Sequence, residues 1–89
     1  MPAYSIEFVK SAQKEFELLP AKIRTKIAEA LSFLSQNPFS DLLMVKKLKG
    51  AEDLYRFRTG DYRVLYEVQR KRLVVLVIKV GNRKEVYRR

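Results

Sequence analysis

The residues best suited to chemistry are three arginines, Arg56, Arg58 and Arg63, on two short stretches of alternating residues that meet at Gly60 and Asp61. A Gly-Asp pair between such stretches predicts a two-residue β-hairpin. Residues two apart on a strand share a face, so the hairpin places the three guanidinium groups on one face, which we call the arginine face. Guanidinium groups gathered in this way bind phosphate or carboxylate oxygens.

The predicted register of the hairpin favours a ligand. Strands paired directly across the turn set Arg58 opposite Arg63, and the next pair on the same face is Arg56 with Leu65. Like charges directly across a strand pair destabilise it, and no acidic residue between positions 54 and 66 shares this face. A bound anion would explain the cluster. The opposite face carries residues suited to a core: Tyr55, Phe57, Val64 and Tyr66.

The composition excludes several kinds of site. The chain has no cysteine and no histidine, which removes disulfides, the usual zinc ligands and the usual neutral-pH general base. We expect no metal and no cofactor. No apolar run approaches the ~18 residues of a membrane span, and the first residues do not form a signal peptide. We therefore expect a cytoplasmic protein with no membrane partner.

The net charge of +9 lies in one half of the chain. Residues 1–44 hold five basic and five acidic residues, whereas residues 45–89 hold fourteen basic and five acidic residues. The pattern predicts a neutral scaffold half and a cationic half that attracts phosphates or an acidic protein.

The first half of the sequence predicts a strand followed by two helices. Alternation over residues 4–8 is typical of a strand with one buried face. Ser11 is the expected N-cap of the first helix, with Phe16 and Leu19 facing inward. Pro20 either ends this helix or opens the second, whose helical periodicity runs from Ala21 until Asn37-Pro38 stops it.

The second half predicts three strands. Residues 39–50 are expected to form a loop, the hairpin follows, and residues 69–72 form a second turn. The apolar run of residues 73–80 is typical of a strand inside the sheet, ended by Gly81. We predict one domain over residues 1–89 with an α+β fold in the order β-α-α-β-β-β, its two N-terminal helices packed on one face of a mostly antiparallel four-stranded sheet.

The predicted topology brings the C-terminal tail to the arginine face. If the last strand runs antiparallel to residues 62–68, its end lies beside Arg63 and the Gly-Asp turn. Arg83 and Tyr87 then emerge next to Arg58 and Arg63. Guanidinium groups beside an aromatic ring suit single-stranded nucleic acid, in which the bases are free to stack.

Four segments resemble the RelE/ParE superfamily of bacterial and archaeal toxins, and with the element order they extend the resemblance over essentially the full chain. The segments are residues 47–50 (KLKG), 53–58 (DLYRFR), 60–66 (GDYRVLY) and 81–87 (GNRKEVY). The intact Arg and Tyr of the last segment favour the RelE branch.

The resemblance implies a ribosome-dependent mRNA endonuclease that works without a metal and is the toxin of a toxin–antitoxin pair. In such enzymes the substrate 2′-hydroxyl attacks the adjacent phosphate. Carried onto this chain, the implied catalytic residues are Arg56, Arg58, Arg63, Arg83 and Tyr87. We assign phosphate clamping to Arg63, stabilisation of transition-state charge or leaving-group protonation to Arg83, and base orientation and stacking to Tyr87. Implied RNA contacts are Lys47, Lys49, Lys84 and Glu85.

Two departures from the family pattern leave the general base open. Relatives can carry lysine where this chain has Arg56 and Arg58, and many carry histidine where Asn82 stands. An arginine remains protonated, with a pKa above ~12, and an asparagine shuttles no proton. The remaining candidates for the base are Glu85, Tyr87, Lys84 and Lys49. There are two alternatives to a strong general base. The enzyme can rely on positioning and charge stabilisation with weaker acid–base catalysis, or it can be inactive.

Two other functions compete with cleavage. A ParE-like protein would inhibit DNA gyrase and cleave nothing, and a cationic RNA-binding module would lack activity altogether. All three predict a cognate acidic antitoxin in a hetero-oligomeric complex, attracted by the positive half of the chain. The nuclease adds the ribosome and mRNA as partners.

Overall fold

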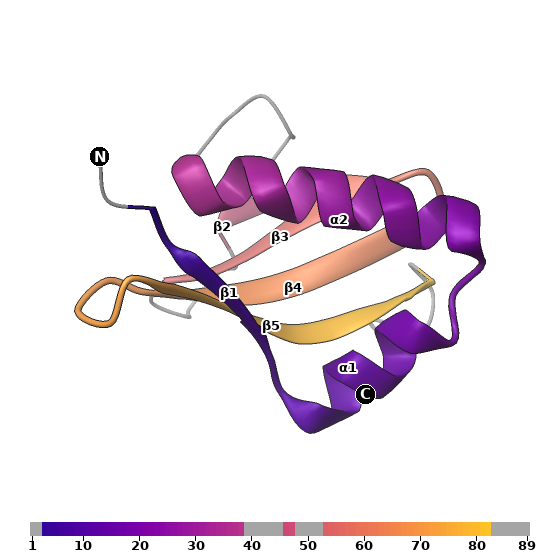
Figure 1. Ribbon diagram of the computed structural model, residues 1–89, viewed down its shortest axis with the longest axis horizontal. Coiled ribbons are helices and arrows are strands. Elements are labelled where there is room, and N and C mark those ends of the chain that lie inside the picture. Colours follow the sequence, from indigo (N-terminus) through magenta and orange to yellow (C-terminus); the bar gives the residue numbers. More distant parts are fainter. Residues whose placement is uncertain (1–2, 39–45, 48–52, 83–89) are drawn as a thin grey trace.

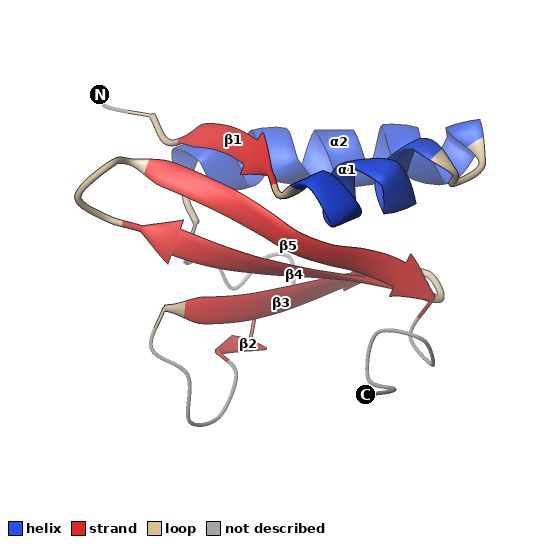
Figure 2. Cartoon of the chain, turned by 90° about the horizontal axis from the view of Figure 1, so that it is seen from below, coloured by secondary structure: helices blue, strands red, loops and turns tan. Residues whose placement is uncertain are grey.

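The computed structural model describes residues 3–38, 46–47 and 53–82. Its elements are β1 (Ser5–Phe8), α1 (Lys10–Glu17), α2 (Ala21–Gln36), β2 (Lys46–Lys47), β3 (Leu54–Thr59), β4 (Tyr62–Gln69) and β5 (Val74–Asn82). The strands form one sheet in the order β1-β5-β4-β3-β2, as Figure 1 shows. Both helices lie on the same side of this sheet (Figure 2), which confirms the predicted α+β fold.

The strand β2 was not predicted. We expected residues 39–50 to form a loop and the sheet to have four strands, but Lys46 pairs with Arg56 and Lys47 with Tyr55. The sheet therefore has four longer strands and a two-residue fifth strand at its edge. The segment lacks the period-two alternation that marks a strand, so only its pairing with β3 defines it. The rest of the predicted loop lies outside the described residues.

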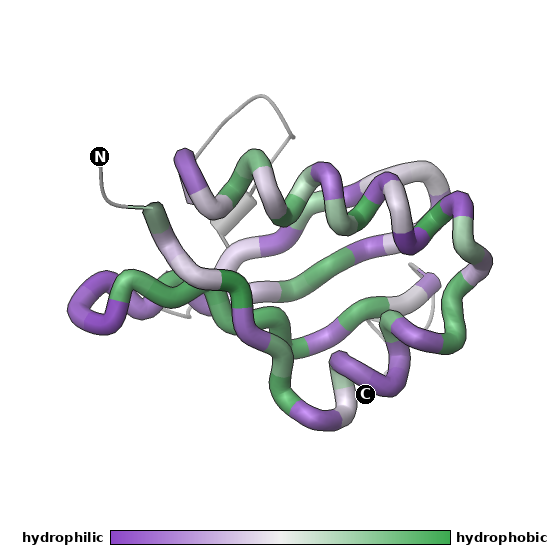
Figure 3. Tube along the Cα trace, in the orientation of Figure 1, coloured by the Kyte–Doolittle hydropathy of each residue, from purple (hydrophilic) through white to green (hydrophobic). Residues whose placement is uncertain are grey.

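The strand β5 lies inside the sheet, as its apolar run predicts. It pairs in parallel with β1 and antiparallel with β4. Figure 3 shows that much of its length is hydrophobic. Gly81 does not end the strand, because Gly81 pairs with Arg63 and Asn82 pairs with Tyr62.

The boundaries of α2 agree with those predicted from the sequence, whereas the start of α1 differs from its prediction. Pro20 is the N-cap residue of α2, and the helix ends before Asn37 as predicted. The prediction of Ser11 as N-cap of α1 is wrong, because Val9 takes that position without any side-chain cap. The Val9 N–H instead donates to the Val77 carbonyl at 3.0 Å, so sheet pairing sets where this helix begins.

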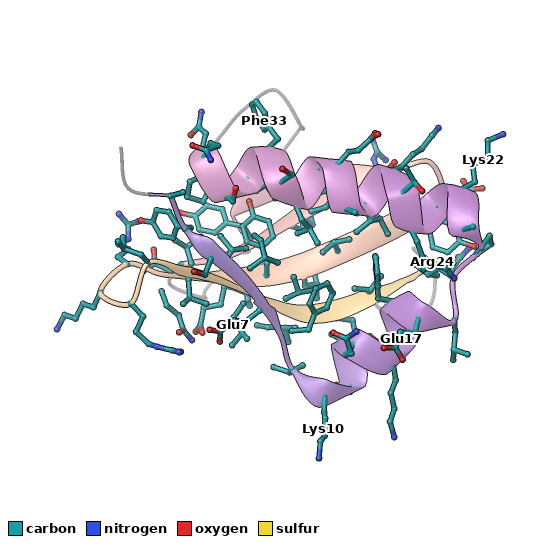
Figure 4. All side chains as sticks on the ribbon, viewed as in Figure 1. Glu7, Lys10, Glu17, Lys22, Arg24 and Phe33 are labelled. Atoms are coloured by element: carbon teal, nitrogen blue, oxygen red, sulfur yellow. The ribbon has the colours of Figure 1, made fainter. Side chains whose placement is uncertain are left out.

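Leu19, expected on the inner face of the first helix, lies in the link between the helices. Its carbonyl accepts a hydrogen bond of 2.8 Å from Arg24 Nη1, which ties the link to α2. Figure 4 shows Lys10 and Lys22 projecting outward from the two helices, away from the sheet. The link therefore joins two helices that turn their charged sides to solvent and their apolar sides to the strands.

The core lies between α2 and the middle of the sheet. Ile27, Leu31 and Leu34 of α2 pack in one cluster with residues of β3, β4 and β5. Tyr66 is fully buried there, and its hydroxyl donates to the Pro38 carbonyl at 2.9 Å. Burial, with a smaller contribution from neighbouring Tyr55, raises the pKa of Tyr66 far above its usual value. Neither of the two described helices is long and apolar enough to cross a membrane.

Candidate functional site

The hairpin β3–β4 has the register that the sequence predicts. Thr59 pairs with Tyr62 around the turn, and Gly60 supplies the positive φ of +60° that such a turn needs. Arg58 lies directly opposite Arg63.

The next pair on this face is Arg56 with Leu65. Phe57 and Val64, at the alternate positions, are buried in the core under the helices. The arginine face is therefore the sheet face that neither described helix covers (Figure 2). Arg58 is exposed, whereas Arg56 and Arg63 are half-buried.

One acidic residue shares this face farther from the turn. The strand β4 continues to Gln69, which places Glu67 opposite Leu54 and diagonal to Arg56. The Glu67 carboxylate accepts a hydrogen bond of 2.8 Å from Gln69 Nε2. Glu67 was not predicted on this face because it lies beyond the alternating residues 54–66, whereas β4 continues past them. The excess of positive charge on the hairpin is thus concentrated beside the turn.

The end of β5 lies beside the same turn. Arg63 pairs with Gly81 and Tyr62 with Asn82, so the chain enters residue 83 at the turn end of the sheet. This confirms the antiparallel placement from which the position of the tail was inferred. The structure places the Lys47 backbone in β2, opposite Tyr55. The other predicted site residues lie outside the described residues and remain predictions: Lys49, Arg83, Lys84, Glu85 and Tyr87.

Two hollows flank the turn end. A groove of about 450 Å³ runs between α2 and the end of β3, lined by residues that include Lys26, Phe33, Phe57 and Arg58. Phe33 projects from α2 (Figure 4) and is 37% exposed. A second hollow of about 380 Å³ lies beside Asn82, between β5 and the link that joins the helices.

Sequence reasoning also missed a contact between α1 and the end of β5. The Glu15 carboxylate bonds both the Lys79 ammonium, at 2.7 Å, and the Val80 N–H, at 2.9 Å. Glu15 and these partners are 64 and 65 residues apart, and no local pattern signals such a contact.

The chemistry of this site is that of fixed cations. Among the described residues, no three acidic side chains gather in a way that could hold a metal ion. Arginines supply charge and paired N–H donors to a phosphate, but they accept no proton at neutral pH. The arginine face can therefore bind and stabilise a phosphate, and a proton acceptor must come from another residue.

Comparison with known proteins identifies the family. The model of the ParE toxin of the type II toxin–antitoxin system parDE matches residues 6–87. The chain belongs to the RelE/ParE toxin family. Among its curated relatives is the mRNA interferase toxin RelE of Escherichia coli, which is 34% identical over 96% of this chain and 90% of its own length. Toxins named RelE recur among the relatives, in agreement with the RelE resemblance of the sequence.

Solved RelE/ParE structures share the fold. The isolated E. coli RelE toxin has a TM-score of 0.81 and 30% identity, covering 90% of this chain and 84% of that one. RelE in the archaeal RelE–RelB complex of Pyrococcus horikoshii has a TM-score of 0.80 and 33% identity, covering 91% and 96%. The second structure shows that a relative assembles with RelB.

Proposed function

We propose that this RelE/ParE toxin is a ribosome-dependent mRNA endonuclease that cleaves mRNA in the ribosomal A site and thereby inhibits translation. One observation carries the proposal: Arg58 faces Arg63 beside the end of β5, on the sheet face that neither described helix covers. A phosphate gives this costly pairing of like charges a purpose. The 34% identity to an mRNA interferase supports RNA as the source of that phosphate.

The proposed reaction needs no metal. The 2′-oxygen of the substrate attacks the adjacent phosphorus, its proton passes to a base, and the bond from phosphorus to the 5′-oxygen breaks. The products are a 2′,3′-cyclic phosphate and a 5′-hydroxyl, which takes up one proton. Negative charge on the phosphate oxygens increases in the transition state, so fixed cations lower the barrier.

The proposal assigns a role to each arginine. Arg63 clamps the reacting phosphate, and Arg56 and Arg58 hold it and its neighbour along the strand. Arg83, which follows Asn82 at the end of β5, stabilises transition-state charge or protonates the leaving oxygen. Tyr87 orients and stacks the base.

The remaining residues of the proposed site contact the RNA. Lys47, Lys49, Lys84 and Glu85 are assigned to RNA binding. The base that accepts the 2′-hydroxyl proton is one of four residues, Lys49, Lys84, Glu85 and Tyr87, unless positioning and charge stabilisation carry most of the rate.

A cognate acidic antitoxin completes the proposal. A relative has been solved in complex with RelB, and this chain carries a net charge of +9. The groove between α2 and β3 combines the exposed Phe33 ring with the positive groups of Lys26 and Arg58. An amphipathic segment with acidic residues matches both features. The resulting toxin–antitoxin complex is a hetero-oligomer.

A second candidate function is inhibition of DNA gyrase without cleavage. The match to the ParE toxin model is the observation that favours it. Gyrase inhibition requires a protein-binding surface and gives no reason for guanidinium groups to converge, so we rank it below RNA cleavage.

Primer extension on translated mRNA tests the proposal. Wild-type protein is compared with Arg63→Ala and with Arg70→Ala, the matched control. Arg70 is exposed, bonds Asp53 at 2.8 Å and lies at the opposite end of the hairpin from the turn. We expect ribosome-dependent cleavage by the wild type and Arg70→Ala, and its loss in Arg63→Ala. Absence of cleavage with growth still inhibited would favour gyrase, and equal cleavage by all three proteins would disprove the role of Arg63.

A further inference from the structure

The edge of β5 that faces away from β4 pairs with β1 over only the first part of the strand. β1 pairs with β5 only as far as Phe8 with Val77, after which the chain turns into α1. Within the described ranges, no strand pairs with that edge beyond Val77. Figure 1 shows α1 beside this second part of β5. An N–H group on this edge therefore needs an acceptor that is not a neighbouring strand.

Glu15 of α1 provides that acceptor. Its Oε1 accepts the Val80 N–H at 2.9 Å, and its Oε2 bonds the Lys79 ammonium at 2.7 Å. The carboxylate thus occupies the place that a strand carbonyl would take. Val80 is 1% exposed and the Glu15 side chain 27%, so the bond is partly shielded from water.

The strand is irregular where Glu15 holds it. Tyr66 pairs with Val77 while Leu65 pairs with Lys79, so Ile78 is an extra residue on β5 and forms a β-bulge. A bulge bends a strand and changes the direction in which the following side chains point. The bond to Val80 comes two residues after the bulge and one residue before Gly81, which pairs with Arg63.

From this geometry we propose that Glu15 is a positioning residue for mRNA cleavage. Its bond to the Val80 N–H, on the edge of β5 that faces away from β4, fixes the bulged end of this strand, where Gly81 pairs with Arg63 and Asn82 pairs with Tyr62. It thereby fixes the point from which the chain continues to Arg83, whose role is proposed above. Glu15 itself touches no substrate. This inference rests on the proposed nuclease function, and it assigns to α1 a part in a reaction whose charged groups all lie in the second half of the chain.

Two variants separate the bond to Val80 from the ion pair. Glu15→Gln keeps an oxygen that can accept the Val80 N–H but loses the charge opposite Lys79, whereas Glu15→Ala loses both interactions. Glu17→Ala is the matched control, because it removes a carboxylate from the same helix that accepts only an exposed hydrogen bond from Gln13. Ile27→Val is a stability control, since it weakens the buried core without changing Glu15 or its two partners.

The first readout is the single-turnover cleavage rate on saturating programmed ribosomes, with the ribosome Kd measured separately. We expect Glu15→Ala to lower the rate by about 100-fold with little change in Kd, since misplacement of a catalytic group by about 1 Å has an effect of this size. Glu15→Gln should stay within about threefold of wild type, because a partly exposed ion pair contributes little. Glu17→Ala and Ile27→Val should cleave at the wild-type rate.

The second readout is hydrogen exchange at the Val80 amide. It should be protected in the wild type and in Glu15→Gln, and should exchange faster in Glu15→Ala. Three outcomes would each overturn this inference while leaving the nuclease function intact. They are a wild-type cleavage rate in Glu15→Ala, equal losses of rate in Glu15→Gln and Glu15→Ala, and a comparable loss of rate in Ile27→Val at a matched Tm. Absence of cleavage by the wild type would overturn both.

Discussion

The two faces of the β3–β4 hairpin carry side chains of opposite character, although they share one backbone. On the face toward the helices, Phe57, Val64 and Tyr66 are at most 1% exposed. On the arginine face, the alternate positions carry Arg58 opposite Arg63. The first face contributes apolar burial, and the second gathers like charge that opposes folding.

The hairpin therefore separates stability from chemistry by period-two alternation alone. Substitutions on the face toward the helices should lower activity only by reducing the fraction of protein that is folded. Substitutions on the arginine face should change the reaction and leave folding intact. Four predictions test this separation.

The largest effect is a loss of stability on the face toward the helices. Phe57→Ala removes a ring that is 1% exposed and should lower the free energy of unfolding by about 3–5 kcal/mol. A loss of that size is a large part of the ~5–15 kcal/mol that stabilises a typical small protein. Urea denaturation followed by circular dichroism measures it. A loss below 1 kcal/mol would mean that the core is not where the structure places it.

The next effect concerns the reaction alone. Arg63→Ala should lower the single-turnover cleavage rate by about 10²–10³-fold, as expected when one donor to transition-state charge is removed. The free energy of unfolding should change by less than it does in Phe57→Ala, because Arg63 is half-buried whereas Phe57 is 1% exposed. Arg63→Lys keeps the charge and loses the paired donors, so its rate should fall between those of wild type and Arg63→Ala. A large loss of stability in Arg63→Ala would contradict the separation of the two faces.

A smaller effect is expected at the buried hydroxyl of Tyr66. Tyr66→Phe removes the 2.9 Å bond to the Pro38 carbonyl and should lower the free energy of unfolding by about 0.5–1.5 kcal/mol. Burial raises the pKa of Tyr66 in the folded state, so its contribution is fully present below the unfolded pKa of about 10 and is lost as pH rises above it. Urea titrations at pH 8 and pH 11 should therefore show a smaller alkaline loss for Tyr66→Phe. Equal losses in the two proteins would contradict this account.

The smallest effect should have the opposite sign. Arg58→Thr removes a like charge from the position opposite Arg63 and introduces a good strand former, so the free energy of unfolding should rise by about 0.2–1 kcal/mol. Cleavage should fall in the same variant. Thermal unfolding at low salt and primer extension measure the two quantities. A variant that is both less stable and fully active would reverse the assignment of this face.

The sequence predicted most of the fold because strong local signals mark its elements. The Gly60-Asp61 pair and the alternation around it were enough for the hairpin register, and Asn37-Pro38 correctly marked the end of α2. The prediction failed at Ser11 and at β2. In both places a hydrogen bond or pairing with another strand decides the structure.

The candidate site divides in the same way. The shared face of Arg56, Arg58 and Arg63 follows from the period of a strand, and the structure confirms it. The roles assigned to these residues and to Arg83 and Tyr87 remain predictions. Glu67 was missed because the alternating segment is shorter than β4, and Glu15 because its partners are far along the chain.

Four features follow from the sequence alone: the hairpin, the second helix, the concentration of positive charge in the second half and the resemblance to RelE toxins. These features depend on residue types and on spacings of a few positions. Three other features became visible only in the folded chain: the parallel pairing of β1 with β5, the bulge at Ile78 and the bonds from Glu15 to the end of β5. Such features join residues more than 60 positions apart or depend on the register between strands, and their energies come from packing and hydrogen bonding that no local pattern encodes.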